Sequence, residues 1–310
     1  MPTRVFIDGA AGTTGLEIAD RLAGRAEFEM VALAGDRRKD SAARREALNG
    51  ADFAVLCLPD DAAREAVALI DPASPVRVID ASSAHRVSGG WTYGFPEIVG
   101  RDAVAGAARV TNPGCYPSGF IALVAPLVRA GLLPADWPFT VNAVSGYSGG
   151  GKGLIERFEA DRDIAWRGYA LGLGHKHVAE MQVLCGLAHP PLFAPAVVPA
   201  HRGMVVEVPL PLAAIPGAAG ADALRDCLAA FYDGSPIVRL GDTPEGGELV
   251  LRQSRAPSDG MELHVFAAPD GSQVRLVAML DNLGKGASGA AVQNLNLMAG
   301  LSETAGLQLP

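Results

Sequence analysis

The sequence lacks paired cysteines and extended basic runs. Its four cysteines, at positions 57, 115, 185 and 227, show no Cys-x-x-Cys spacing, which is typical of a reduced, cytosolic protein rather than of a disulfide framework. The only compact basic run is Arg37-Arg38-Lys39, and the net charge is −8. This charge pattern disfavours nucleic acid and acidic membrane surfaces as partners.

Membrane spans and export signals are also missing from the sequence. The longest apolar run, 120–128, is shorter than a bilayer-spanning helix requires. Arg4 and Asp8 interrupt the apolar N-terminal run, so we expect no signal peptide and a cytoplasmic location.

The chain does have the size and composition of a loop-rich α/β enzyme. It has 310 residues, of which 49% are hydrophobic and 19% charged, with 37 glycines and 22 prolines. This length is enough for about two domains and a sizeable core. No internal repeat and no Pro- or Ser-rich linker divides it.

A glycine turn lies near the N-terminus, between a predicted buried strand (4–8) and a predicted helix. Its spacing is Gly-x-x-Gly-x-x-Gly instead of the commoner Gly-x-Gly-x-x-Gly. A strand, a glycine turn and a helix are the context in which backbone can approach a pyrophosphate at the helix N-terminus. We therefore predict a nucleotide site and assign these residues to the cofactor: Gly9, Gly12, Thr13, Thr14 and Gly15.

Further apolar runs predict strands at 28–34, 53–58, 76–79 and 108–110, with a helix at 62–70 between two of them. Strands that alternate with helices form a right-handed, mostly parallel sheet. Ligands bind at the carboxyl ends of such strands. Polar or chemically distinctive residues follow several of these ends, and we expect one crevice to collect them: Pro59, Ser82, Ser83 and Cys115. Of these, Pro59 and Ser82 are assigned to the cofactor.

The residues after the second strand bear on which nicotinamide cofactor is used. An acid there favours NAD, whereas arginines favour the 2′-phosphate of NADP. Asp36, Arg37 and Arg38 supply both signals. We expect NADP, held by Arg37 or Arg38, and the alternative is a solvated basic turn.

A buried helix is predicted at 120–128, and Pro126 should kink it or displace its start. It is preceded by the run Asn112-Pro113-Gly114-Cys115-Tyr116-Pro117-Ser118-Gly119. Pro117 suits the first turn of a helix. Cys115 should then sit at a helix N-terminus, where the dipole and free N–H groups stabilise a thiolate and a developing oxyanion. We predict that Cys115 is a nucleophile; the alternative is an inert, buried cysteine.

A base for this thiol is available in the run 174–181. His177 and Glu180 are three residues apart and would share a helix face, where a carboxylate raises the basicity of an imidazole. His175 would point elsewhere and is the second candidate. We expect no metal here, because no second cluster supplies the remaining ligands.

After Cys115 the pattern changes to that of an α+β domain with a mainly antiparallel sheet. Strands are predicted at 139–145, 203–210, 261–266 and 274–280, with a hairpin turn at 269–271 and an amphipathic helix at 222–233. The segment 146–153 is predicted to be a mobile loop that forms an anion site with Lys152.

The run 281–296 leads from a glycine-rich turn into a helix with small residues on one face. We expect this helix to return to the first domain, and we assign Asn282 and Gly284 to the cofactor. The fold class predicted is therefore α/β, with a Rossmann-type parallel sheet domain at 1–114 and 282–310. An α+β catalytic and dimerisation domain occupies 115–281.

Together these features indicate one reaction class. A thiolate attacks a carbonyl and holds it covalently, while a hydride moves to or from a nicotinamide. This is the chemistry of an acylating aldehyde dehydrogenase, or of its reverse on an acyl phosphate.

The same segments resemble the shorter form of the N-acetyl-gamma-glutamyl-phosphate reductase family, within the aspartate-semialdehyde dehydrogenase-like group. The resemblance covers essentially the whole chain. It is carried by the runs 9–15, 93–97, 112–119, 175–180 and 281–296. Aspartate-semialdehyde dehydrogenases share the first glycine turn but usually lack the Pro-Gly insertion before the cysteine.

The resemblance implies arginine biosynthesis, NADPH, and reduction of N-acetyl-glutamyl phosphate to the semialdehyde with release of phosphate, through a thioester on Cys115. It implies that His177, held by Glu180, manages protons. The residues it implies for the phosphate or the rest of the substrate are Arg86, Lys152 and Ser118. The usual Ser-Arg after the second strand is replaced here by Asp36-Arg37-Arg38. We also expect a homo-oligomer, either a dimer or a tetramer.

Two alternatives remain open at this point. One is a related acyl-phosphate reductase of the aspartate-semialdehyde dehydrogenase type. The other is a non-catalytic, dinucleotide-sensing protein in which Cys115 is a redox switch.

Overall fold

The computed structural model describes residues 2–242 and 244–309. These residues form two compact units. The first combines the chain up to residue 113 with residues 287–307, and the second combines residues 114–286 with the C-terminal end. In the described part of the chain, every helix is too short or too polar to cross a membrane.

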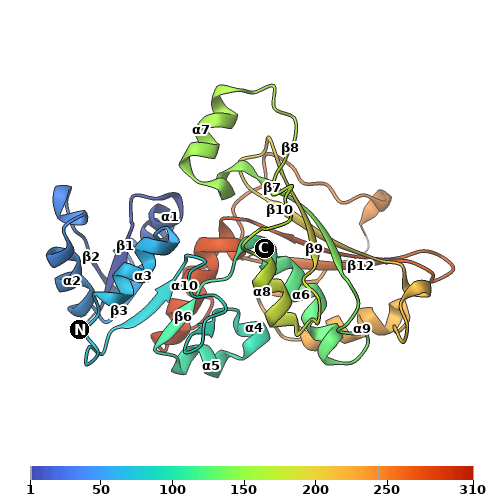
Figure 1. Ribbon diagram of the computed structural model, residues 1–310, viewed down its shortest axis with the longest axis horizontal. Helices are drawn as coiled ribbons and strands as arrows, with labels where there is room; N and C mark the ends of the chain where they lie inside the picture. Colours follow the sequence, from blue (N-terminus) through green and yellow to red (C-terminus); the bar gives the residue numbers. More distant parts are fainter. Residues whose placement is uncertain (1, 243, 310) are drawn as a thin grey trace. The chain divides into compact units, whose positions relative to one another are not determined.

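The first unit is built on a six-stranded sheet in which all neighbours run parallel, in the order β2-β1-β3-β4-β6-β5. Figure 1 labels β1, β2, β3 and β6 of this sheet. The predicted Rossmann-type parallel sheet is therefore confirmed. The strands are β1 (Thr3–Asp8), β2 (Phe28–Val31), β3 (Phe53–Leu56), β4 (Arg77–Asp80), β5 (Thr92–Tyr93) and β6 (Arg109–Thr111).

Helices bury both faces of this sheet. Along β1, Val5 and Ile7 point into one core and Phe6 into the other, as the alternation of side chains in a strand requires. The first core is closed by α1 (Thr13–Leu22), α5 (Arg101–Gly106) and α10 (Gly289–Met298), and the second by α2 (Ser41–Asn49) and α3 (Asp60–Ala68). A short helix, α4 (Pro96–Val99), precedes α5.

The stretch between β2 and β3 differs from the prediction. The second strand ends at Val31 instead of residue 34, and a 3-10 helix, η1 (Gly35–Arg38), follows it. The helix α2 was not predicted, because only three of its residues are buried and its composition is mostly polar. Its start is set by Asp40, whose carboxylate accepts a hydrogen bond from the Ala43 amide at 2.7 Å.

The second unit contains a seven-stranded mixed sheet, in the order β11-β12-β13-β10-β7-β9-β8. Four of its neighbouring pairs are antiparallel and two are parallel, which confirms a mainly antiparallel sheet. The predicted strands correspond to β7 (Thr140–Gly146), β10 (Met204–Leu210), β12 (Met261–Ala267) and β13 (Val274–Leu280). Strands not predicted are β8 (Arg167–Gly168), β9 (Leu192–Val198) and β11 (Val238–Leu240).

The helix α6 (Cys115–Arg129) packs on this sheet beside α8 (Val178–Cys185) and α9 (Ala221–Phe231). It begins five residues earlier than predicted and runs through Pro126. Pro126 has no N–H to donate to the carbonyl of Ala122. The hydroxyl of Tyr232 donates to that carbonyl instead, at 2.9 Å, so the buried oxygen keeps a partner.

The prediction of a mobile loop at 146–153 is wrong. The segment forms a 3-10 helix, η2 (Tyr147–Gly150), and then enters α7 (Lys152–Ala160; Figure 1). The ring of Tyr147 stacks on Phe158 with 5.2 Å between centroids, and Ser148 is buried. Glycines in this run therefore permit a tight turn between a strand and a helix.

Candidate functional site

A pocket of about 770 Å³ opens at the carboxyl ends of β1, β2 and β3 in the first unit. The strand β1 has β2 on one side and β3 on the other, which is the point where α/β sheets bind their ligands. The residues that line it are Phe6 to Ala11, Ala19, Met30 to Leu33, Gly35, Asp36, Arg38, Lys39, Arg44, Leu58 and Ala62.

The glycine turn brings backbone, without side chains, to this pocket. Gly9 has a φ of +90°, and a Cβ there would lie 2.3 Å from the carbonyl oxygen of Cys57. A Cβ at Gly15 would lie 2.5 Å from the carbonyl oxygen of Gly9. Gly12 precedes α1 as its N-cap, and Thr13, Thr14 and Gly15 form the first turn of that helix. The arrangement suits a phosphate at the helix N-terminus.

The two arginines considered for the cofactor lie differently. Arg38 lines the pocket together with Lys39. The guanidinium of Arg37 is 3.3 Å from Glu46 and 63% exposed, on the surface of the unit. The geometry therefore favours Arg38 over Arg37 as a contact for a bound phosphate.

Sequence reasoning missed an ion pair at the edge of the same pocket. Arg44 lies 2.8 Å from Asp8, and both side chains are nearly buried. The pair neutralises the carboxylate at the end of β1, so it does not repel an anionic ligand. Arg44 lies on α2, so the pair could have been predicted only if that helix had been recognised. The apolar face of α2 is too small to give a clear sequence signal.

Ser82 lies in a buried polar cluster at the carboxyl end of β4. Its hydroxyl donates to Asp80 at 2.8 Å and its amide to the same carboxylate at 2.9 Å. The Nδ1 atom of His85 lies 2.6 Å from Asp80, and the His85 ring stacks on Trp91. Arg86 donates to the carbonyl of Ala81 at 3.2 Å.

Pro59 is the N-cap of α3 and, with Ser82 and Ser83, belongs to the first unit. Cys115 belongs to the second unit. The expectation that one crevice collects all four residues stays a prediction.

Cys115 is the first residue of α6 and is half-buried. Burial raises the pKa of Cys57 to about 12 and also raises the pKa of Cys185 and Cys227. Those three thiols therefore stay protonated near neutral pH, whereas the helix N-terminus favours negative charge on the sulfur of Cys115.

Glu180 stabilises the turn before Cys115 from a distant part of the chain. Its buried carboxylate accepts a hydrogen bond from the amide of Gly114 at 2.9 Å. The hydroxyl of Ser118 donates to the carbonyl of the same glycine, also at 2.9 Å. Sequence reasoning named both residues but did not foresee these contacts, because they depend on how α8 packs beside α6.

Aromatic rings and both candidate histidines gather around Tyr116, the residue that follows Cys115 in the chain. The ring of His175 lies 4.6 Å from that of His177, 5.6 Å from Tyr169 and 6.4 Å from Tyr116, measured between centroids. The amide of His177 donates to Nδ1 of His175 at 3.1 Å. A neutral His175 ring therefore carries its proton on Nε2.

The run after β13 stays in the second unit as far as Gly286. Both ends of the Asn282 side-chain amide are used there: its oxygen accepts from the amide of Gly203 and its nitrogen donates to Ser148, each at 2.9 Å. A Cβ at Gly284 would lie 1.9 Å from the carbonyl oxygen of Ser258. A Cβ at Gly286 would lie 2.9 Å from the Cβ of Cys115.

Gly286 was not predicted, although it lies against the Cβ of Cys115. The glycines of the run 281–296 gave a signal, but nothing in their spacing indicated which of them faces Cys115. Lys152, a predicted substrate contact in the same unit, is exposed at the start of α7.

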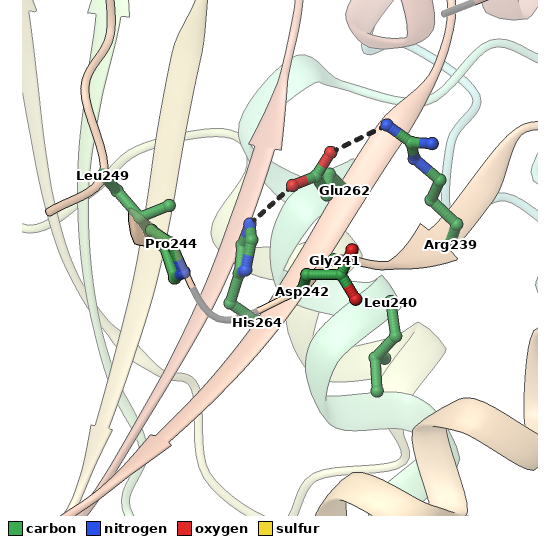
Figure 2. A pocket seen from close by; sticks show the side chains of 8 residues that line it. All are labelled: Arg239, Leu240, Gly241, Asp242, Pro244, Leu249, Glu262 and His264. Carbon is green, nitrogen blue, oxygen red and sulfur yellow. Dashed lines mark hydrogen bonds and ion pairs between the residues drawn. The ribbon is translucent and has the colours of Figure 1, made fainter. Parts of the chain in front are cut away.

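A second pocket, of about 280 Å³, lies between β11, β12 and the residues that follow β11 (Figure 2). Glu262 lies 3.0 Å from Arg239 and 3.0 Å from Nε2 of His264, and Figure 2 shows its carboxylate between these two side chains. None of the predicted site residues lines it. Across residues 2–242 and 244–309, no three His, Cys, Asp or Glu side chains group as metal ligands.

Comparison with known families identifies both halves of the chain. Residues 4–107 match the model of the semialdehyde dehydrogenase NAD binding domain, and residues 115–282 match that of the semialdehyde dehydrogenase dimerisation domain.

Curated relatives are similar over nearly the whole length. The chain is 46% identical to the N-acetyl-gamma-glutamyl-phosphate reductase of Trichormus variabilis, with 98% of this chain and 99% of that protein covered. It is 50% identical to that of Burkholderia ambifaria (96% of each) and 48% identical to that of Brucella ovis (97% of this chain, 100% of the relative).

Solved structures share the fold at much lower identity. Aspartate semialdehyde dehydrogenase II from Vibrio cholerae has a TM-score of 0.68 at 18% identity, covering 96% of this chain and 98% of that one. Aspartate semialdehyde dehydrogenase from Francisella tularensis has a TM-score of 0.69 at 12% identity, covering 96% and 99%. The predicted resemblance is confirmed: the chain belongs to the N-acetyl-gamma-glutamyl-phosphate reductase family, within the semialdehyde dehydrogenase fold.

Proposed function

We propose that this protein reduces N-acetyl-glutamyl 5-phosphate to N-acetyl-glutamate 5-semialdehyde and phosphate, with NADPH, in arginine biosynthesis. The printed names of relatives at 46–50% identity support the substrate. The observation that carries the chemistry is a half-buried cysteine at the first residue of α6, followed by Tyr116, whose ring contacts two histidines.

The first chemical step belongs to Cys115. Its thiolate attacks the acyl carbon, the C–O bond to phosphate breaks, phosphate leaves with the electron pair, and a thioester remains on the sulfur. The dipole of α6 favours the negative charge of the oxyanion, and Gly114 places no capping side chain at this helix start. A bound nicotinamide supplies the hydride that reduces the acyl group to the aldehyde.

His177 is our proposed acid and base, with Glu180 as its carboxylate partner. His175 is the alternative, but its Nδ1 already accepts the His177 amide. A neutral His175 then presents an N–H at Nε2 and is a better donor than base. Glu180 also orders the turn through its bond to Gly114.

The nicotinamide dinucleotide belongs to the first unit, whose residues match an NAD binding domain. We propose NADP specifically, with its 2′-phosphate held by Arg38 and supported by Lys39. Both side chains line the pocket beyond β2, where a 2′-phosphate is bound in such folds. Asn282 and Gly284 remain proposed cofactor contacts.

Arg86, Lys152 and Ser118 remain our proposed contacts for the substrate. Arg86 and Lys152 offer positive charge to the phosphate or the carboxylate. The Ser118 hydroxyl donates to Gly114, so it would offer the substrate an acceptor. We also propose that the second unit forms the contacts of a dimer or tetramer, in keeping with its dimerisation-domain match, and that the enzyme works in the cytoplasm.

The test is an assay of phosphate-dependent NADP reduction with N-acetyl-glutamate semialdehyde and, separately, with aspartate semialdehyde. We expect turnover with the first, and a preference for the second would overturn the substrate. Quenched reactions with the acyl phosphate should carry an acyl adduct on the Cys115 peptide by mass spectrometry. Cys115→Ser should lose nearly all turnover and keep NADPH affinity, whereas cofactor binding without any turnover would favour a sensing protein.

A further inference from the structure

Arg44 and Asp8 form an ion pair in the wall of the pocket of the first unit. Only 11% of the Arg44 side chain and 6% of the Asp8 side chain are exposed, and both residues line the pocket. The removal of two charges from water costs free energy that their attraction often only offsets. A nearly buried pair at this position is therefore better explained by a ligand than by a gain in stability.

The hydrogen bonds of Arg44 leave one nitrogen of its guanidinium without an acceptor. Nε and Nη2 both donate to the same oxygen of Asp8, at 3.0 and 2.8 Å. Within residues 2–242 and 244–309, no group accepts a hydrogen bond from Nη1. That nitrogen is also not one of the buried atoms that lack a partner, so it is accessible. Asp8 thus fixes the plane of the guanidinium, and the Nη1 donors remain available to an anion in the pocket.

The pair lies on the side of β1 away from the helix start that suits a pyrophosphate. Val5 and Ile7 face the core closed by α1, whereas Phe6 faces the core closed by α2 and α3. Asp8 follows Phe6 by two residues, so its side chain points to the side of α2. The glycine turn leads into α1 instead. Arg44 is therefore better placed for a phosphate other than the pyrophosphate.

Arg44 belongs to the segment that carries the other cations of the pocket. Residues 35–44 run from the end of β2 into α2, and three of their cations line the pocket: Arg38, Lys39 and Arg44. In folds of this kind, the ribose that carries the 2′-phosphate lies beyond the second strand. Arg38 and Lys39 are exposed, so they lose side-chain freedom on binding, whereas Arg44 is already fixed by Asp8.

We propose that Arg44 is the main determinant of the preference for NADP over NAD, with Nη1 donating to the 2′-phosphate. Arg38 and Lys39 then add weaker contacts from the exposed side of the pocket. This inference rests on the proposed use of NADP and names the residue that would carry it.

The experiment measures the dissociation constants of NADPH and NADH for the full chain by fluorescence titration, together with the melting temperature. Arg44→Met alone leaves the Asp8 carboxylate buried without its partner, so this variant should melt at a lower temperature and bind both cofactors weakly. The double variant, Asp8→Asn with Arg44→Met, removes both charges and keeps the net charge of the chain. We expect its NADH affinity to return close to that of the unaltered chain. Its NADPH affinity should stay roughly 10- to 100-fold weaker, because a charge-assisted hydrogen bond is lost.

Arg44→Lys gives a second measurement that does not depend on how the double variant folds. It keeps a positive charge beside Asp8 but replaces the planar fork by a single ammonium. We expect its melting temperature and NADH affinity to stay close to those of the unaltered chain, and its NADPH affinity to fall about fivefold or more. If the double variant does not fold, the ratio of the two dissociation constants in Arg44→Lys decides the question.

Arg45→Met is the matched control, because Arg45 is the next residue on α2 and also forms an ion pair. Its guanidinium lies 3.0 Å from Asp71, both side chains are exposed, and neither residue lines the pocket. This variant should change neither dissociation constant. A loss of NADPH affinity equal to that of the double variant would assign the effect to something other than a contact in the pocket, and would overturn the proposal.

The two proposals fail in different ways. If the unaltered chain binds NADH as tightly as NADPH, the proposed use of NADP is wrong. If the unaltered chain prefers NADPH and the folded double variant keeps that preference, Arg44 only neutralises Asp8 and its proposed role alone is overturned. An equal loss of NADPH and NADH affinity in the folded double variant would also overturn it, since Arg44 would then contact a part that both cofactors share.

Discussion

The glycine turn of the first unit and the cysteine turn of the second are both strand-to-helix connections with a glycine at the N-cap. Neither Gly12 nor Gly114 supplies a capping side chain, so no side chain of the N-cap residue covers either helix start. The two turns are stabilised differently. Contacts of Gly9 and Gly15 with nearby backbone shape the first, whereas the second depends on Glu180 and Gly286 from distant parts of the chain.

The difference teaches how each site tolerates change. The first turn depends on its backbone conformation, so substitution of its glycines should lower stability and cofactor affinity. The second turn holds one sulfur atom in position, so substitution of its neighbours should lower the reaction rate. Substitutions in the two turns should therefore separate stability from catalysis.

The largest effect is expected from Gly9→Ala. A Cβ would overlap the Cys57 carbonyl at 2.3 Å in a backbone conformation with φ of +90°. We expect a loss of about 3 kcal/mol in the free energy of unfolding, or roughly 6–12 °C in melting temperature, and loss of NADPH binding. Calorimetry and fluorescence titration check both, and a melting temperature within a degree of the unaltered chain would contradict the packing argument.

Gly286→Ala should instead damage the reaction. The added methyl would lie 2.9 Å from the Cβ of Cys115, so the sulfur must move. We expect kcat to fall about 100-fold, as for other small displacements of reacting groups, while NADPH affinity stays the same. Gly24→Ala, where the added Cβ meets no atom within 4 Å although φ is +76°, is a control for backbone strain remote from the thiol. Equal losses of kcat in the two variants would contradict a specific effect on Cys115.

A smaller effect should distinguish the two arginines of the first unit. Arg38→Ala should weaken NADPH binding about tenfold, the usual value of one charged contact, and leave NADH binding unchanged. Arg37→Ala removes an exposed pair with Glu46 and should change neither. Titration of both cofactors with both variants checks this, and the reverse ranking would move the 2′-phosphate contact to Arg37.

The smallest effect is the dependence of stability on alkaline pH. Burial raises the pKa of Cys57 from its usual 9.0 to about 12, so between these values the folded chain binds a proton that the unfolded chain has lost. Stability therefore falls as pH rises from about 9 towards 12. Urea unfolding of Cys57→Ala between pH 8 and about 11 should show a shallower decline. An identical slope in the two proteins would show that other groups cause the loss.

The sequence predicted best those elements whose signals are local. The strand, glycine turn and helix at the N-terminus follow from residues that are adjacent in the chain. The place of Cys115 at the N-terminal end of α6 follows from Pro117, although the apolar run alone put the start of this helix five residues too late. It failed for α2, whose apolar face is only three residues, and for β9, whose pairing with β7 is a parallel contact across about 50 residues. The loop predicted at 146–153 failed because glycines that permit a turn look the same as glycines in a mobile segment.

The sequence by itself determined that a nucleotide turn opens the chain and that Cys115 begins a helix, because both depend on the conformational limits of glycine and proline within a few residues. Only the tertiary structure decided which side chains reach these turns. Arg44 pairs with Asp8, Glu180 binds Gly114, and Gly286 lies against Cys115. The ring of Tyr169 also contacts that of His175. Such contacts join segments far apart in the chain, and the order of strands in each sheet, which no local pattern encodes, brings them together.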